Sequence, residues 1–335
     1  MLLHPAIMAL LLLSLLVTAM LLPAALFALQ ILRHWNMQSG SARQLALERK
    51  TYLISTLLTW VFTAELLSLF LFIYSAEALS GQFVGAMCAT GVLNINAWGW
   101  PTLWLKIVTF FAGSLWLIMN QLDNHGYDFP LIRQKYILLL LIVPLLLAGG
   151  YSQLSFFSAL NPEVITSCCG SLFSADAQGV AAELSGIAPK NALLMLTVAA
   201  LILCVTAYLV LKQGTRLTAL AFSITALLFF AIALSAIVSA VALYIYQHPH
   251  HHCPFCLLKA GHHYSGYLLY LPLFVATALA LPLPFIARCQ AIPSLSATAH
   301  RWVKQLSRSS LALYLLFLVI VLLEIAASPL RLLSQ

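Results

Sequence analysis

The chain has 335 residues, of which 62% are hydrophobic and only 7% are charged, whereas soluble domains carry about 25% charged residues. This composition and a mean hydropathy of +0.98 exclude an ordinary soluble domain and predict a chain embedded in a lipid bilayer. The formal net charge of +7 does not indicate a nucleic-acid partner, because the basic residues fall in short loops without a contiguous basic face.

The long apolar runs predict an all-α, polytopic integral membrane bundle in a single domain, residues 1–335. Only helices satisfy the backbone of such continuous runs inside lipid, and about 20 residues suffice to cross it. We expect about eight transmembrane helices, at residues 6–32, 52–78, 103–121, 136–158, 192–211, 217–246, 266–287 and 309–327. The first run lacks a basic n-region and a small-residue cleavage pattern, so we expect a span and not a cleaved signal.

The distribution of lysine and arginine predicts the orientation of these helices. Cytoplasmic loops carry an excess of these residues. Twelve of the sixteen fall on one side of the predicted bundle: Arg33, Arg43, Arg49, Lys50, Arg133, Lys135, Lys212, Arg216, Arg288, Arg301, Lys304 and Arg308. The other side receives Lys106, Lys190, Lys259 and Arg331. Both termini are therefore predicted to face outward, away from the cytoplasm.

This orientation places five of the seven cysteines on the outer side. The outer loops are residues 79–102, with Cys88, residues 159–191, with Cys168 and Cys169, and residues 247–265, with Cys253 and Cys256. If the membrane is a bacterial inner membrane, these loops face the periplasm, where disulfides form and persist. The sequence thus predicts a shared, cysteine-rich and histidine-rich outer site.

The third outer loop carries the most informative pattern, a Cys-Pro-Phe-Cys pair at Cys253 and Cys256 among six histidines. One thiolate of such a pair can be stabilised by a helix start or an imidazolium while the other resolves a mixed disulfide, and we expect Cys256 near the start of the seventh span. With neutral imidazoles the same thiolates would bind zinc or copper. The candidate metal ligands are His250, His251, His252, His262 and His263. The alternative to a redox or metal-binding role is a structural disulfide beside a solvated histidine-rich loop.

The remaining outer cysteines add two observations. Adjacent residues such as Cys168 and Cys169 form a strained ring when they bond to each other, so different partners or a shared soft metal ion are expected. One of them could instead bond Cys88 as a structural staple. Because the outer cysteines are odd in number, at least one sulfur stays reduced, pairs between chains or binds a ligand.

Glu65 is the unusual residue within the predicted spans. An ionisable group in the middle of a span is costly and is a functional hypothesis by default, here a proton or ion relay. The alternative is a protonated carboxyl group that is hydrogen-bonded to a neighbouring helix.

The residues Cys253 to Leu258 resemble the active-site corner of membrane thiol oxidoreductases of the DsbB and vitamin K epoxide reductase type. In those families, a CxxC pair facing the periplasm or lumen passes electrons from other loop cysteines to a quinone. The resemblance implies that Cys253 and Cys256 form the quinone-side pair and that Cys88, Cys168 or Cys169 act as shuttle thiols. The families are four-helix bundles, and this chain is expected to be larger.

Three hypotheses follow from these patterns. The leading hypothesis is thiol–disulfide electron transfer, serving maturation of exported cysteine or metal proteins, with a periplasmic thiol or metal protein as partner. The second is binding or translocation of a soft metal ion, Cu(I) or Zn(II), by the same residues. The third is a structural membrane subunit that docks a periplasmic partner.

Overall fold

The computed structural model describes residues 4–36, 39–166 and 187–330. All regular structure within these ranges is helical, and eight segments are long and apolar enough to cross a membrane. They are Pro5–His34, Ala42–Gln82, Gly99–Asp123, Ile132–Ser158, Pro189–Gln213, Arg216–Tyr246, Ser265–Cys289 and Ser296–Ala327. Every predicted span lies within one of them, which confirms the all-α prediction and the number of candidate spans. The side of the membrane that each end faces stays a prediction.

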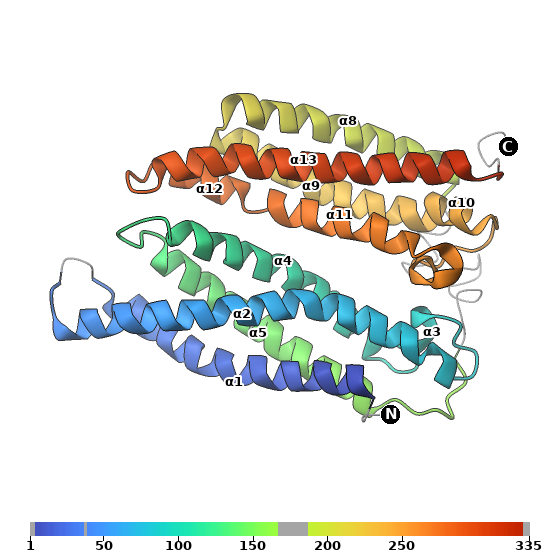
Figure 1. The fold of residues 1–335 in the computed structure, drawn as a ribbon, viewed down its shortest axis with the longest axis horizontal. Helices are drawn as coiled ribbons and strands as arrows, with labels where there is room; N and C mark the ends of the chain where they lie inside the picture. Colours follow the sequence, from blue (N-terminus) through green and yellow to red (C-terminus); the bar gives the residue numbers. More distant parts are fainter. Residues whose placement is uncertain (1–3, 37–38, 167–186, 331–335) are drawn as a thin grey trace. The chain divides into compact units, whose positions relative to one another are not determined.

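The chain divides into two compact units (Figure 1). The first contains α1 (Pro5–His34), most of α2 (Ala42–Leu79), α4 (Gly99–Asp123) and α5 (Ile132–Ser158). The second contains the end of α2, most of α3 (Ala89–Leu93), α8 (Pro189–Gln213), α9 (Arg216–Ala236), α10 (Ala242–Tyr246), α11 (Ser265–Ala280), nearly all of α12 (Leu283–Cys289) and most of α13 (Ser296–Ala327). Each unit is described by itself below.

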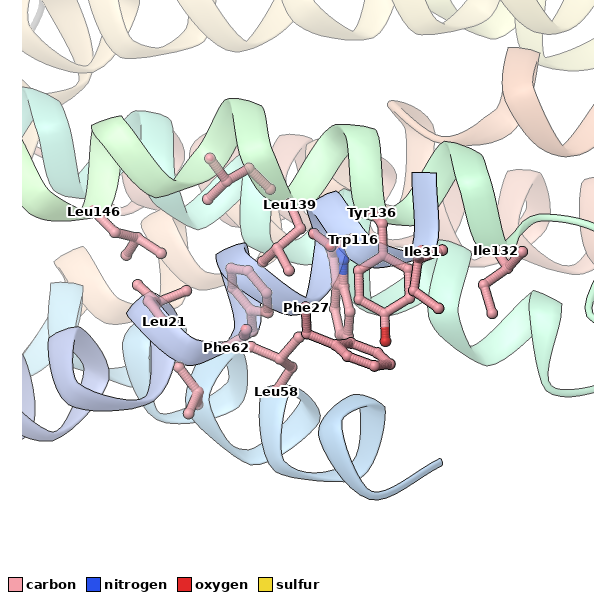
Figure 2. Close-up of a cluster of buried hydrophobic side chains, with 14 of the residues drawn as sticks. Leu21, Phe27, Ile31, Leu58, Phe62, Trp116, Ile132, Tyr136, Leu139 and Leu146 are labelled. Atoms are coloured by element: carbon pink, nitrogen blue, oxygen red, sulfur yellow. The ribbon is translucent and has the colours of Figure 1, made fainter. Parts of the chain in front are cut away.

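The first unit is held by an apolar core to which all four of its helices contribute, as Figure 2 shows. The ring of Phe62 packs against Trp116 at a centroid distance of 4.8 Å, and Phe27 meets Tyr136 edge to face at 5.7 Å. Aromatic pairs of this kind add about 0.5–1.5 kcal/mol beyond the area that they bury. The core explains why apolar runs without a strongly one-sided pattern still form a defined bundle.

The second unit joins its helices partly through buried hydroxyl groups. Thr277 on α11 shares a hydrogen bond of 2.8 Å with the phenol of Tyr314 on α13. Ser310 on α13 donates to the carbonyl of Ala276, and Ser223 on α9 donates to the carbonyl of Ala280. Small hydroxylated residues let apolar helices approach closely and bond across the interface. The short link Lys212–Arg216 joins α8 and α9, and Gly214 within it adopts a left-handed φ of 63°.

Candidate functional site

Three cysteine sulfurs lie together in the second unit. The Sγ atoms of Cys88, Cys253 and Cys256 are all within 4.8 Å of one another, and all three residues are buried. The Sγ atoms of Cys88 and Cys253 are 3.4 Å apart, which is a contact between two thiols and not a disulfide bond of about 2.05 Å. The structure therefore brings Cys88, from the first predicted outer loop, together with the Cys-Pro-Phe-Cys pair from the third.

Two tyrosines fix the backbone at the first cysteine of the pair and at the proline that follows it. The phenol of Tyr246, the last residue of α10, donates to the carbonyl of Cys253 at 2.5 Å. The phenol of Tyr270, on α11, donates to the carbonyl of Pro254 at 2.8 Å. The loop that carries the pair is thus anchored to both helices that flank it.

The second cysteine of the pair begins a 3-10 turn, Cys256–Leu258, and not the seventh span. A second 3-10 turn, Ala260–His262, follows it, and α11 starts only at Ser265. The helix cannot extend back to Cys256 because His263 and Tyr264 both have left-handed φ values, 53° and 55°. The expected placement of Cys256 near the start of the seventh span is therefore wrong, because α11 does not begin at this cysteine.

Close packing around two glycines positions the loop that carries Cys88 (the Cys88 loop) and the segment Cys253–Leu258 (the CPFC turn). A Cβ atom on Gly91 would lie 2.7 Å from the Cα atom of Ala86, so glycine permits the loop to fold tightly before α3. A Cβ atom on Gly266 would lie 2.8 Å from the side chain of Leu258, so the first 3-10 turn rests directly on α11. Thr90, beside Cys88, places its hydroxyl 3.4 Å from the Sγ atom of Cys253.

Lys259 supplies the positive charge next to the sulfurs. Its Nζ atom lies 3.0 Å from the Glu77 carboxylate at the end of α2, and it also donates to the carbonyl of Met87. Partial burial acts to lower the pKa of Lys259, but Glu77 and the nearby sulfurs of Cys256 and Cys88 raise the pKa above the usual lysine value. A cation beside thiols favours their thiolate form, which is the nucleophile and the metal-binding species.

Within the part of the chain that the structure describes, no loop histidine belongs to the group of three sulfurs. The Nδ1 atom of His252 donates to the carbonyl of Val238 at 3.0 Å, within the π-helical segment Ile237–Val241. This bond leaves its Nε2 atom as the acceptor of the neutral ring. The rings of His251 and His262 pack on Tyr246 at 4.2 and 4.6 Å.

Two of these rings are biased toward the neutral form. Burial, followed by repulsion from neighbouring histidines, lowers the pKa of both His252 and His262. Lys259 is thus a better source of positive charge for the sulfurs than His252 or His262. The metal-binding role predicted for His250, His251, His252, His262 and His263 stays a prediction.

The sulfur spacing also fits a soft metal ion. Thiolates around tetrahedral zinc, with Zn–S bonds of about 2.3 Å, lie about 3.8 Å apart. The observed separations run from 3.4 Å to no more than 4.8 Å, so modest side-chain rotation would suit zinc or copper. Within the described ranges, Cys88, Cys253 and Cys256 form the one such cluster of potential ligands. Cys168 and Cys169, also predicted for this site, lie outside the described residues.

In the first unit, Glu65 has a partner that the sequence reading missed. The Nζ atom of Lys106, on α4, lies 3.3 Å from the Glu65 carboxylate and donates to the hydroxyl of Ser68 at 2.8 Å. Lys106, which the sequence assigned to the outer set of basic residues, is buried within α4 with its side chain only 5% exposed, and the side of the membrane that it is nearer to stays a prediction. The relay role of Glu65 stays a prediction, and its pairing accounts for its presence in a span.

Lys135 is a second basic residue whose place differs from the prediction. It was assigned to a cytoplasmic loop, yet it is fully buried near the start of α5. Its Nζ atom lies 2.7 Å from the Asp123 carboxylate and donates to the Asn120 side chain at 3.1 Å. A carboxylate, Asp123, three residues after the amide of Asn120 at the end of α4 was the available signal, and the apolar run alone could not reveal it.

Comparison with protein-family models, with curated proteins and with solved structures gave no match to this chain.

Proposed function

We propose that this multi-span membrane protein carries out thiol–disulfide electron transfer at the cluster of Cys88, Cys253 and Cys256. The observation that carries the proposal is the mutual reach of three buried sulfurs, with Cys88 and Cys253 in contact at 3.4 Å. A movement of about 1.4 Å would bring these two sulfurs to bonding distance. The odd number lets one disulfide move among three sulfurs while a thiol always remains.

The chemistry is an ordinary sequence of exchange steps. A thiolate of a partner dithiol attacks the Cys253–Cys256 disulfide, forms a mixed disulfide and releases one cluster thiolate. The second partner thiol then attacks the partner sulfur in the mixed disulfide, so that the partner leaves oxidised and Cys253 and Cys256 are left as two thiols beside that of Cys88. Two electrons and two protons pass to the cluster in each cycle. Within the cluster, the Cys88 thiolate can attack Cys253 and release Cys256, which moves the disulfide without net oxidation.

The setting of this chemistry belongs to the same proposal. The site faces the periplasm of a bacterial inner membrane, and its partner is an exported thiol or metal protein. Cys168 and Cys169 pass electrons to the cluster from their own loop. A quinone dissolved in the bilayer accepts the electrons, as the resemblance to DsbB and vitamin K epoxide reductase implies.

Disulfide mapping and thiol counting on the purified full chain test the proposal. The sample is equilibrated with glutathione redox buffers, alkylated and analysed by mass spectrometry. We expect a reversible disulfide within the cluster, loss of the Cys253–Cys256 bond in Cys253→Ser, and an unchanged pattern in the matched control Cys204→Ser. A cluster that keeps three thiols across the whole range of buffers would refute electron transfer.

A second candidate, binding of Cu(I) or Zn(II), is favoured by the compact spacing of the three thiols, all within 4.8 Å. Elemental analysis of the same sample would then give about one ion per chain, lost in the triple Cys→Ser variant and retained in Cys204→Ser. The third hypothesis, a structural subunit, predicts neither a reversible disulfide nor bound metal, and only lower stability after cysteine replacement.

A further inference from the structure

The loop that carries Cys88 is held on both sides of this cysteine by one ion pair. Lys259 donates to the carbonyl of Met87, the residue before Cys88. Glu77 accepts from the backbone N–H of Ala89, the residue after it, at 2.8 Å. The two side chains are joined to each other at 3.0 Å.

We propose that Lys259 and Glu77 are positioning residues that hold Cys88 against Cys253 and thereby determine how readily the disulfide moves between Cys253–Cys256 and Cys88–Cys253. This inference rests on the proposed function for its redox consequence. The placement of Cys88 itself does not depend on any redox activity.

The pair connects the two halves of the cluster. Lys259 follows Cys256 by three residues, and its backbone N–H donates to the Cys256 carbonyl at 3.1 Å. Glu77 belongs to the last turns of α2, which lead into the Cys88 loop. The ion pair thus ties the CPFC turn to the Cys88 loop across 172 residues of sequence, the separation of Lys259 from Met87.

The ion pair of Lys259 and Glu77 is expected to act on the position of Cys88 and not on the stability of the whole fold. The side chains of Lys259 and Glu77 are 35% and 17% exposed, and ion pairs at such sites contribute little to global stability. Each member, however, also makes a hydrogen bond to the backbone next to Cys88. The expected effect is therefore local and appears as a change in the position of one sulfur, since a misplacement of about 1 Å can slow a reaction about 100-fold.

A cross-linking experiment measures this position without requiring turnover. The full chain retains only Cys88 and Cys253, the other five cysteines being replaced by alanine, and reacts with a short bifunctional thiol reagent. A parallel chain that retains only Cys253 and Cys256 reports whether the CPFC turn is intact. We expect Lys259→Met to reduce Cys88–Cys253 cross-linking about tenfold, with Cys253–Cys256 cross-linking unchanged.

Three further variants separate positioning from simple charge. Lys259→Arg keeps donors for both Glu77 and the Met87 carbonyl and should restore cross-linking to within about twofold. The exchanged pair Glu77→Lys/Lys259→Glu keeps the ion pair but can form neither backbone hydrogen bond, so its cross-linking should stay low. Lys190→Met, an exposed lysine at the start of α8, is the matched control and should behave as the parent chain.

The outcomes decide between the alternatives. Unchanged cross-linking in Lys259→Met, full restoration by the exchanged pair, or equal loss of both cross-links would each overturn the proposal. In the chain with all its cysteines, glutathione buffers should show about tenfold less Cys88–Cys253 relative to Cys253–Cys256 disulfide after Lys259→Met. If cross-linking falls as expected but no cluster disulfide forms in any buffer, the positioning role holds and electron transfer is refuted.

Discussion

The buried pair of Glu65 and Lys106 allows a quantitative prediction about ionisable residues in the first unit. Their side chains are 9% and 5% exposed, and Lys106 also donates to the hydroxyl of Ser68 at 2.8 Å. The substitution Glu65→Gln keeps the size and one carbonyl oxygen but removes the negative charge. The Lys106 ammonium is then left buried without a counter-ion, which is the costly half of a broken ion pair.

The destabilisation caused by Glu65→Gln has an upper limit, because Lys106 can lose its proton and become neutral. Removing one partner of a buried pair costs about 3–5 kcal/mol. Lys106 can escape this cost by releasing its proton, and at pH 7 that release costs about 4.6 kcal/mol, from a usual pKa of about 10.4 and 1.36 kcal/mol per unit. We therefore expect Glu65→Gln to lower the free energy of unfolding at pH 7 by about 3–4.6 kcal/mol.

The same reasoning gives a sign for the pH dependence. Each pH unit above 7 makes release of the proton cheaper by about 1.36 kcal/mol. Raising the pH from 7 to 9 should therefore reduce the destabilisation of Glu65→Gln relative to the parent chain by up to about 2.7 kcal/mol. The double variant Glu65→Gln/Lys106→Met removes both charges and should recover most of the loss at pH 7.

Reversible unfolding in mixed detergent micelles, followed by circular dichroism at pH 7 and pH 9, measures these differences. A loss below about 1 kcal/mol in Glu65→Gln, a typical value for a weak surface pair, would refute the reasoning. So would a double variant no more stable than the single one. A chain in which Glu65→Gln is stable but impairs proton movement in vesicles would favour the relay role over the structural one.

Three other predictions address other parts of the fold. Gly91→Ala should lower the unfolding free energy by about 1–3 kcal/mol, because its Cβ atom would lie 2.7 Å from the backbone of a preceding residue; an unchanged thermal melt would contradict this. The pKa of Lys259 is raised in the folded chain, so the stability from its pair with Glu77 is complete below the ordinary lysine pKa of about 10.4 and is lost as the pH rises through the folded-state pKa. The melting-temperature difference between the parent chain and Lys259→Met should thus be constant from about pH 6 to pH 9 and shrink above about pH 10.5. Lys135→Met leaves Asp123 buried and should cost about 3–5 kcal/mol, with most of it recovered by adding Asp123→Asn; equal stability of single and double variants would count against the pairing.

The spans could be predicted from sequence because a bilayer demands long apolar helices whatever their neighbours are. The hairpin at Lys212–Arg216 was equally accessible, since a glycine in a short polar link leaves few alternatives. Two of the charges could not be placed this way. Lys106 and Lys135 each form an ion pair with one carboxylate on a neighbouring helix. A hydropathy profile cannot show such pairing between helices.

The candidate site was predictable as a set of residue types but not as a geometry. The sidedness of the loops grouped Cys88 with Cys253 and Cys256, and the structure brings these three sulfurs together. The helix start expected near Cys256 failed because two successive left-handed residues, His263 and Tyr264, interrupt the helix. The contribution of Lys259 was missed because its partner, Glu77, is distant in sequence and looks like an ordinary residue at the end of a span.

The number of sulfurs bears on whether this site does chemistry or only fastens loops. A structural staple needs two cysteines, and a third within 4.8 Å exposes the staple to attack by its own neighbour. Any disulfide within the cluster leaves one thiol close to it, and Lys259 favours the thiolate form of Cys256 and Cys88. Every oxidised form of the cluster therefore retains a nucleophile next to a bond that it can break. Thiol–disulfide exchange requires a thiol next to a disulfide, whereas a permanent structural disulfide would be made less stable by one.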